Sequence, residues 1–117
     1  MTNILEKIIE EKKHSLDLIK KEKSLDILEK NIKEQNFVNF KETIQKNRNV
    51  SLITEIKKAS PSAGVLVNNF DHLEIAKMYV NNGATCLSVL TEEKYFLGKL
   101  DYIQDIKKQR YYIDIRN

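Results

Sequence analysis

The sequence has little of several residues that mark particular protein classes: one cysteine, one proline, three glycines and no tryptophan among 117 residues. The single cysteine, Cys86, excludes an intrachain disulfide and is typical of a reducing compartment. No apolar run approaches the roughly 18 residues that a membrane span needs, and acidic residues appear before any signal-type apolar segment. We therefore expect a cytoplasmic chain with no membrane partner.

The sequence also lacks a large excess of positive or negative charge. It has 20 Lys and Arg and 17 Asp and Glu, which gives a net charge of +3. A nucleic-acid-binding protein usually gathers its basic residues on one face, whereas here acids and bases alternate, as in "LEKIIEEKKHSLDLIKKEK". This pattern favours a solvated helix face, and we expect no nucleic-acid partner. His14, His72 and Cys86 have no partners at metal-ligand spacing, so no metal site is expected.

The first 48 residues have helical periodicity. Apolar residues recur on one stripe from residue 4 to about residue 20, and Asn3 and Glu6 have the spacing of a capping box. Ser24 is a candidate N-cap for a second helix, which ends before "EQNFVNF". A short third helix is predicted in "FKETIQKN". These helices predict an N-terminal helical segment, 1–48.

From residue 49 the pattern changes to alternating strands and helices. The β-branched run "VSLITEI" and the apolar run "ATCLSVLT" predict two strands. Between them, a helix begins after Asp71 and ends at Gly83. Strand, helix, strand is a βαβ unit with a parallel sheet and a right-handed crossover. "LDYIQDIKKQ" predicts another helix, and "YYIDI" is a weaker candidate for a third strand.

Charged residues stand where the first strand ends. Alternation places Glu55 and Lys57 on one face of that strand, at the carboxyl end where parallel α/β sheets hold their active sites. The following Ser60-Pro61-Ser62 turn offers hydroxyls and backbone donors to a phosphate. Spacing alone favours an ordinary exposed strand end with a weak ion pair. In the loop after the second strand, Phe96 suits either a ligand pocket or packing beneath its own loop, and the spacing does not separate these alternatives.

Taken together, "LITEIKKASPSAGVL" and "FDHLEIAKMYVNNGATCLSVLTEEKYFLG" resemble the indole-3-glycerol-phosphate synthase family. The first stretch matches the family signature of a Glu, an apolar residue, a Lys, two variable positions and Ser-Pro-Ser. The resemblance extends to about Lys108 and implies an α/β fold: a (β/α)8 TIM barrel preceded by a helical extension. Because such a barrel needs about 250 residues, it implies an extension, 1–48, followed by the first two to three βα units of an incomplete barrel, 49–117.

The resemblance also implies an activity. The family is a lyase of tryptophan biosynthesis that closes the ring of 1-(2-carboxyphenylamino)-1-deoxyribulose 5-phosphate, with loss of carbon dioxide and water and without metal or organic cofactor. By similarity, Lys57 would hold the substrate carboxylate and Glu55 would lie near the catalytic lysine and the reacting carbons. Ser60 would help to hold the phosphate, and Phe96 would pack on the anthranilate ring.

One segment departs from the family. The family's third strand ends in a catalytic lysine followed by Asp-Phe, whereas the corresponding region here reads "RYYIDIRN". Neither Arg116 nor Asn117 replaces a lysine in proton transfer, so we expect the chain to be inactive alone, and a shifted reading frame is one hypothesis for the segment. Uncovered sheet edges predict marginal stability and self-association. The alternative is a non-catalytic phosphate-binding or assembly module derived from the barrel.

Overall fold

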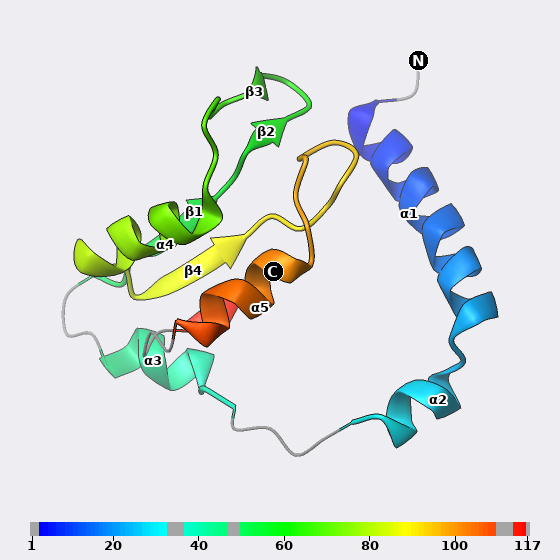
Figure 1. The fold of residues 1–117 in the computed structure, drawn as a ribbon, viewed down its shortest axis with the longest axis horizontal. Helices are drawn as coiled ribbons and strands as arrows, with labels where there is room; N and C mark the ends of the chain where they lie inside the picture. The colour runs from blue at the N-terminus through cyan, green and yellow to red at the C-terminus, as the bar shows by residue number, and fades with distance from the viewer. Residues whose placement is uncertain (1–2, 33–36, 47–49, 110–113, 117) are drawn as a thin grey trace. The chain divides into compact units, whose positions relative to one another are not determined.

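The computed structural model describes residues 3–32, 37–46, 50–109 and 114–116. The chain divides into two compact units, Met1–Asn36 and Phe37–Asn117 (Figure 1). The predicted division into an extension, 1–48, and barrel units, 49–117, concerns the parts of a larger fold and stays a prediction.

The first unit contains two helices, α1 (Ile4–Glu22) and α2 (Leu25–Lys30). Asn3 caps α1 by the predicted capping box: its side chain accepts from the Glu6 amide at 2.9 Å, and the Glu6 carboxylate accepts from the Asn3 amide at 3.2 Å. The Ser24 hydroxyl accepts from the Ile27 amide at the start of α2. Both predicted helices and both caps are confirmed.

The second unit is built on a three-stranded parallel sheet in the order β1-β4-β5, formed by β1 (Ile53–Ile56), β4 (Cys86–Val89) and β5 (Asp114–Arg116). The register places Glu55 opposite Ser88, and Ser88 opposite Arg116. The weaker third-strand candidate, 111–115, is therefore confirmed over residues 114–115, and the strand continues to Arg116, while residues 111–113 lie outside the described part of the chain. The unit begins with the predicted short helix, α3 (Phe40–Lys46).

Helices connect the parallel strands. Between β1 and β4 the chain forms a small antiparallel hairpin, β2 (Ala59–Ser60) with β3 (Gly64–Val65), and then α4 (His72–Asn81). Asp71 caps α4 by accepting from the Leu73 and Glu74 amides, and Gly83 follows the helix with a φ of 91°. After β4 comes α5 (Asp101–Lys108). The predicted βαβ unit is confirmed.

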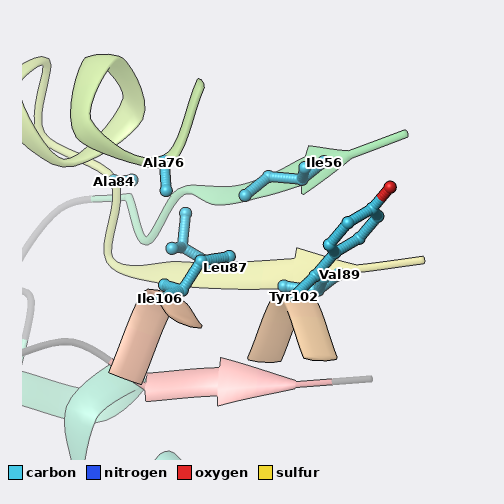
Figure 2. Close-up of a cluster of buried hydrophobic side chains, with 7 residues drawn as sticks. All are labelled: Ile56, Ala76, Ala84, Leu87, Val89, Tyr102 and Ile106. Carbon is cyan, nitrogen blue, oxygen red and sulfur yellow. The ribbon is translucent and has the colours of Figure 1, made fainter. Parts of the chain in front are cut away.

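The core lies on one face of this sheet (Figure 2). Ile56 of β1 and Leu87 and Val89 of β4 are almost completely buried, and they meet side chains from both helices. The helix residues in this cluster are Ala76 of α4 and Tyr102 and Ile106 of α5, with Ala84 before β4. Side chains alternate across a strand. On β1, Ile53 and Glu55 therefore point to the face opposite that of Ile56, and both are exposed there.

No helix in the described part of the chain combines the length and the apolar character needed to cross a membrane.

Candidate active site

Glu55 and Lys57 meet at the carboxyl end of β1. The Lys57 Nζ lies 2.6 Å from the Glu55 Oε1. The Lys57 side chain is 31% exposed and that of Glu55 is 46% exposed. The predicted pairing of these side chains on one face is confirmed. A partly exposed ion pair contributes little to stability, but its carboxylate and ammonium remain open to a polar ligand.

The backbone around this pair is fixed by buried and hydrogen-bonded neighbours. Ile56, between the two charged residues, is 1% exposed in the core. The Tyr79 hydroxyl of α4 donates to the Glu55 carbonyl oxygen at 3.0 Å, and the Leu90 amide donates to the Ile56 carbonyl oxygen at 3.1 Å. The pair therefore projects from a strand end that is held on both sides, while its side chains stay accessible.

The Ser-Pro-Ser turn forms the tip of the β2-β3 hairpin. The Ser60 Oγ accepts from the Ala63 amide at 3.2 Å and lies 3.4 Å from the Ser62 Oγ. Gly64 takes the left-handed conformation, with a φ of 67°, that lets the chain turn back. The Leu66 amide then closes the hairpin by donating to the Lys58 carbonyl oxygen. Two neighbouring hydroxyls are thus presented beyond β1, and the one that accepts in their mutual contact keeps its proton for an anion.

The loop after β4 is organised by Glu92. Its Oε1 accepts from the Lys94 amide at 3.0 Å, and its Oε2 accepts from the Tyr95 and Phe96 amides at 2.7 and 3.1 Å. The Gly98 amide donates to the Glu92 carbonyl oxygen at 2.8 Å. Phe96 is half-buried within this loop. Nothing in the sequence of this loop singles out Glu92, and the structure places it at the centre of the hydrogen bonds.

An open hollow of about 540 Å³ lies at the same edge of the sheet. Lys58 contributes from the segment after β1, and the loop after β4 and the start of α5 contribute the other lining residues, which include Glu93, Leu97 and Lys99. The segments that follow the two strands therefore border one shared space, as the carboxyl ends of neighbouring parallel strands do in α/β proteins.

Of the four residues predicted for the site, Glu55 and Lys57 are in direct contact, whereas Ser60 and Phe96 lie on separate segments that leave the same edge of the sheet. Their roles in binding or catalysis stay predictions. Sequence reasoning missed Glu92 and Tyr79 as residues that hold these segments. For Tyr79, the sequence predicts only a place in the helix between Asp71 and Gly83, and it does not indicate a bond to a strand carbonyl 24 positions away.

His72 also has a partner that the sequence did not indicate. Its Nε2 lies 2.9 Å from the Asp105 Oδ2, and its ring stacks on Tyr102 with 4.3 Å between the ring centroids. These contacts join the start of α4 to α5, so His72 has a structural place between the helices. In the described ranges, no three His, Cys, Asp or Glu side chains gather as metal ligands would.

Known proteins are similar to this chain over nearly its whole length. The family model described as "Indole-3-glycerol phosphate synthase" matches residues 5–115, which is further than the predicted limit near Lys108. Indole-3-glycerol phosphate synthases of Desulforamulus reducens and Clostridium acetobutylicum are 46% and 44% identical over 107 residues, or 91% and 90% of this chain. That of Bacillus pumilus is 51% identical over 70 residues, covering 59% of this chain and 28% of its own. The chain spans about 40% of the length of the first two relatives.

Proposed function

Because this chain belongs to the indole-3-glycerol phosphate synthase family, we propose that it supplies the first two strand ends of that family's active site. In this proposal the parallel β1-β4-β5 sheet, with helices on one face, is the start of a (β/α)8 barrel. The face that carries Glu55 would then line the barrel interior. The complete enzyme would close the ring of 1-(2-carboxyphenylamino)-1-deoxyribulose 5-phosphate with loss of carbon dioxide and water.

The contact between Glu55 and Lys57 carries this proposal. The two charged side chains lie 2.6 Å apart on the face opposite the core, at the strand end where a barrel enzyme holds its catalytic groups. An ammonium in this place attracts a substrate carboxylate, and the neighbouring carboxylate restrains the lysine side chain. We assign Lys57 to the substrate carboxylate and place Glu55 beside the reacting carbons.

The other two assignments follow the chemistry of the same substrate. Its phosphate suits the hydroxyl of Ser60, which stands in the hairpin directly after β1. Its aromatic ring suits the half-buried ring of Phe96 in the loop after β4. Each group of this substrate then has a matching side chain near the two strand ends. The proposal uses only charges, hydroxyls and an aromatic ring, and it needs neither metal nor organic cofactor.

Variants of the lysine test the proposal. The chain is mixed with the remaining part of a relative's barrel, and formation of indole-3-glycerol phosphate is followed by indole fluorescence, to which this chain adds no tryptophan background. Lys57→Met removes the charge and keeps much of the side-chain volume. Lys77→Met makes the same change at an exposed position of α4.

We expect the wild-type and Lys77→Met mixtures to be active, and Lys57→Met to reduce kcat/KM by at least about 100-fold, as expected when a charged partner of the substrate is lost. Equal activity of the two variants would contradict the role of Lys57. Substrate binding in the mixture without product would favour the non-catalytic phosphate-binding module.

A further inference from the structure

The Glu92 side chain is used entirely within its own loop. Both carboxylate oxygens accept backbone hydrogen bonds, from three consecutive amides at Lys94, Tyr95 and Phe96, with distances between 2.7 and 3.1 Å. The acceptor is charged, so these bonds are stronger than those between neutral groups. One half-buried side chain therefore fixes the backbone of the residue that carries the Phe96 ring.

The end of the loop is fixed as well. The Gly98 amide donates to the Glu92 carbonyl oxygen, and Gly98 is buried against the backbone of Leu90 and Thr91. Leu97, which lies between Phe96 and Gly98, has a φ of 52°, a conformation that a leucine adopts only when its surroundings impose it. Between the held ends, the three hydrogen bonds to the carboxylate restrain the backbone of residues 94–96.

We propose that Glu92 is a positioning residue, which holds the Phe96 ring in the place where the aromatic part of the substrate packs. The role of Phe96 in this inference rests on the proposed function. The ordering of the loop by Glu92 does not, since it depends only on hydrogen bonds within the loop. Glu92 itself does not touch the reacting atoms.

Replacement of Glu92 by two different residues separates the contributions of its oxygens. Glu92→Ala removes all three acceptor contacts. Glu92→Gln keeps one carbonyl oxygen, which can still accept from the Tyr95 and Phe96 amides, but its NH₂ group faces the Lys94 amide, so that one bond is lost. Glu74→Gln, on the exposed side of α4, is the control for the same change of charge.

Amide hydrogen exchange in the full chain reads out the loop directly. We expect the amides of residues 94–96 to exchange at least about tenfold faster in Glu92→Ala than in the wild type, a factor that corresponds to about 1.4 kcal/mol. In Glu92→Gln the increase should be smaller, and in Glu74→Gln these amides should exchange at the wild-type rate. The Leu90 amide, which donates to β1, reports whether each variant keeps its sheet. Wild-type exchange at residues 94–96 in Glu92→Ala would overturn the inference.

Activity in the mixture with the rest of a barrel tests the consequence for Phe96. Glu92→Ala and Phe96→Ala should each raise KM, and the double variant should be no worse than Phe96→Ala alone, because Glu92 acts through that ring. Glu92→Gln should recover part of the loss. Effects that multiply in the double variant would overturn a positioning role. If the wild-type mixture is inactive although its parts associate, the proposed function fails, while the exchange rates still decide whether Glu92 orders the loop.

Discussion

Replacement of Gly98 by alanine would make a methyl group clash with the main chain just after β4. A Cβ built on Gly98 overlaps the Leu90 carbonyl oxygen and lies 2.8 Å from the Leu90 carbonyl carbon and 2.9 Å from that of Thr91. All three atoms belong to the main chain, so no side-chain rotation relieves the overlap. The loop between Glu92 and Gly98 has to move away from the strand.

The cost follows from these contacts. Forcing an extra methyl group into a packed site costs about 1–3 kcal/mol. The shift also breaks or lengthens the 2.8 Å hydrogen bond from the Gly98 amide to the Glu92 carbonyl oxygen, which adds about 1 kcal/mol. We therefore expect Gly98→Ala to reduce the free energy of unfolding by roughly 2–4 kcal/mol.

Urea unfolding of the full chain measures this change, with Gly64→Ala as the control. A Cβ on Gly64 meets no atom within 4 Å, so its only cost is the left-handed backbone, about 1–2 kcal/mol. Amide exchange at Phe96 should rise in Gly98→Ala and stay at the wild-type rate in Gly64→Ala. If Gly98→Ala unfolds within about 0.5 kcal/mol of the wild type and its loop amides exchange as before, the reasoning from close packing is refuted.

Three further predictions concern the rest of the fold. Leu87 of β4 is fully buried against both helices, so Leu87→Ala should lower the free energy of unfolding in urea by about 2–5 kcal/mol. Leu100 is 67% exposed, and Leu100→Ala should stay within about 0.5 kcal/mol of the wild type. Equal losses would contradict the described core. Asp71→Ala should cost about 1 kcal/mol by uncapping α4, and Asp71→Asn should restore most of it, so an unchanged midpoint in Asp71→Ala would argue against the cap. The described sheet ends at β1 and β5, and its open edges predict a molar mass that rises with concentration in sedimentation equilibrium; a sharply melting monomer at all concentrations would contradict this.

Local signals made much of the fold predictable from the sequence. Asn3, Ser24 and Asp71 each cap the predicted helix, because a cap depends only on the residue and the three that follow it. The parallel arrangement of β1 and β4 followed from the order of strand, helix and strand. The meeting of Glu55 and Lys57 followed from the two-residue period of a strand.

Features that depend on the folded loop or on distant residues were not predictable in this way. Glu92 is followed by two charged residues and then by Tyr95 and Phe96, and its role appears only when the backbone curls so that three amides face one carboxylate. The contact of His72 with Asp105 joins residues 33 positions apart on different helices. Periodicity assigns each of these residues to a helix or a loop but does not say which partner the fold brings near it.

Transfer of activity between two inactive parts tests the central claim most directly. The wild-type chain, the remaining part of a relative's barrel, and their mixture are assayed for ring closure of 1-(2-carboxyphenylamino)-1-deoxyribulose 5-phosphate. If this chain contributes working site residues, product should form in the mixture and with neither part alone. A mixture that contains the associated parts, binds no substrate and forms no product would contradict it.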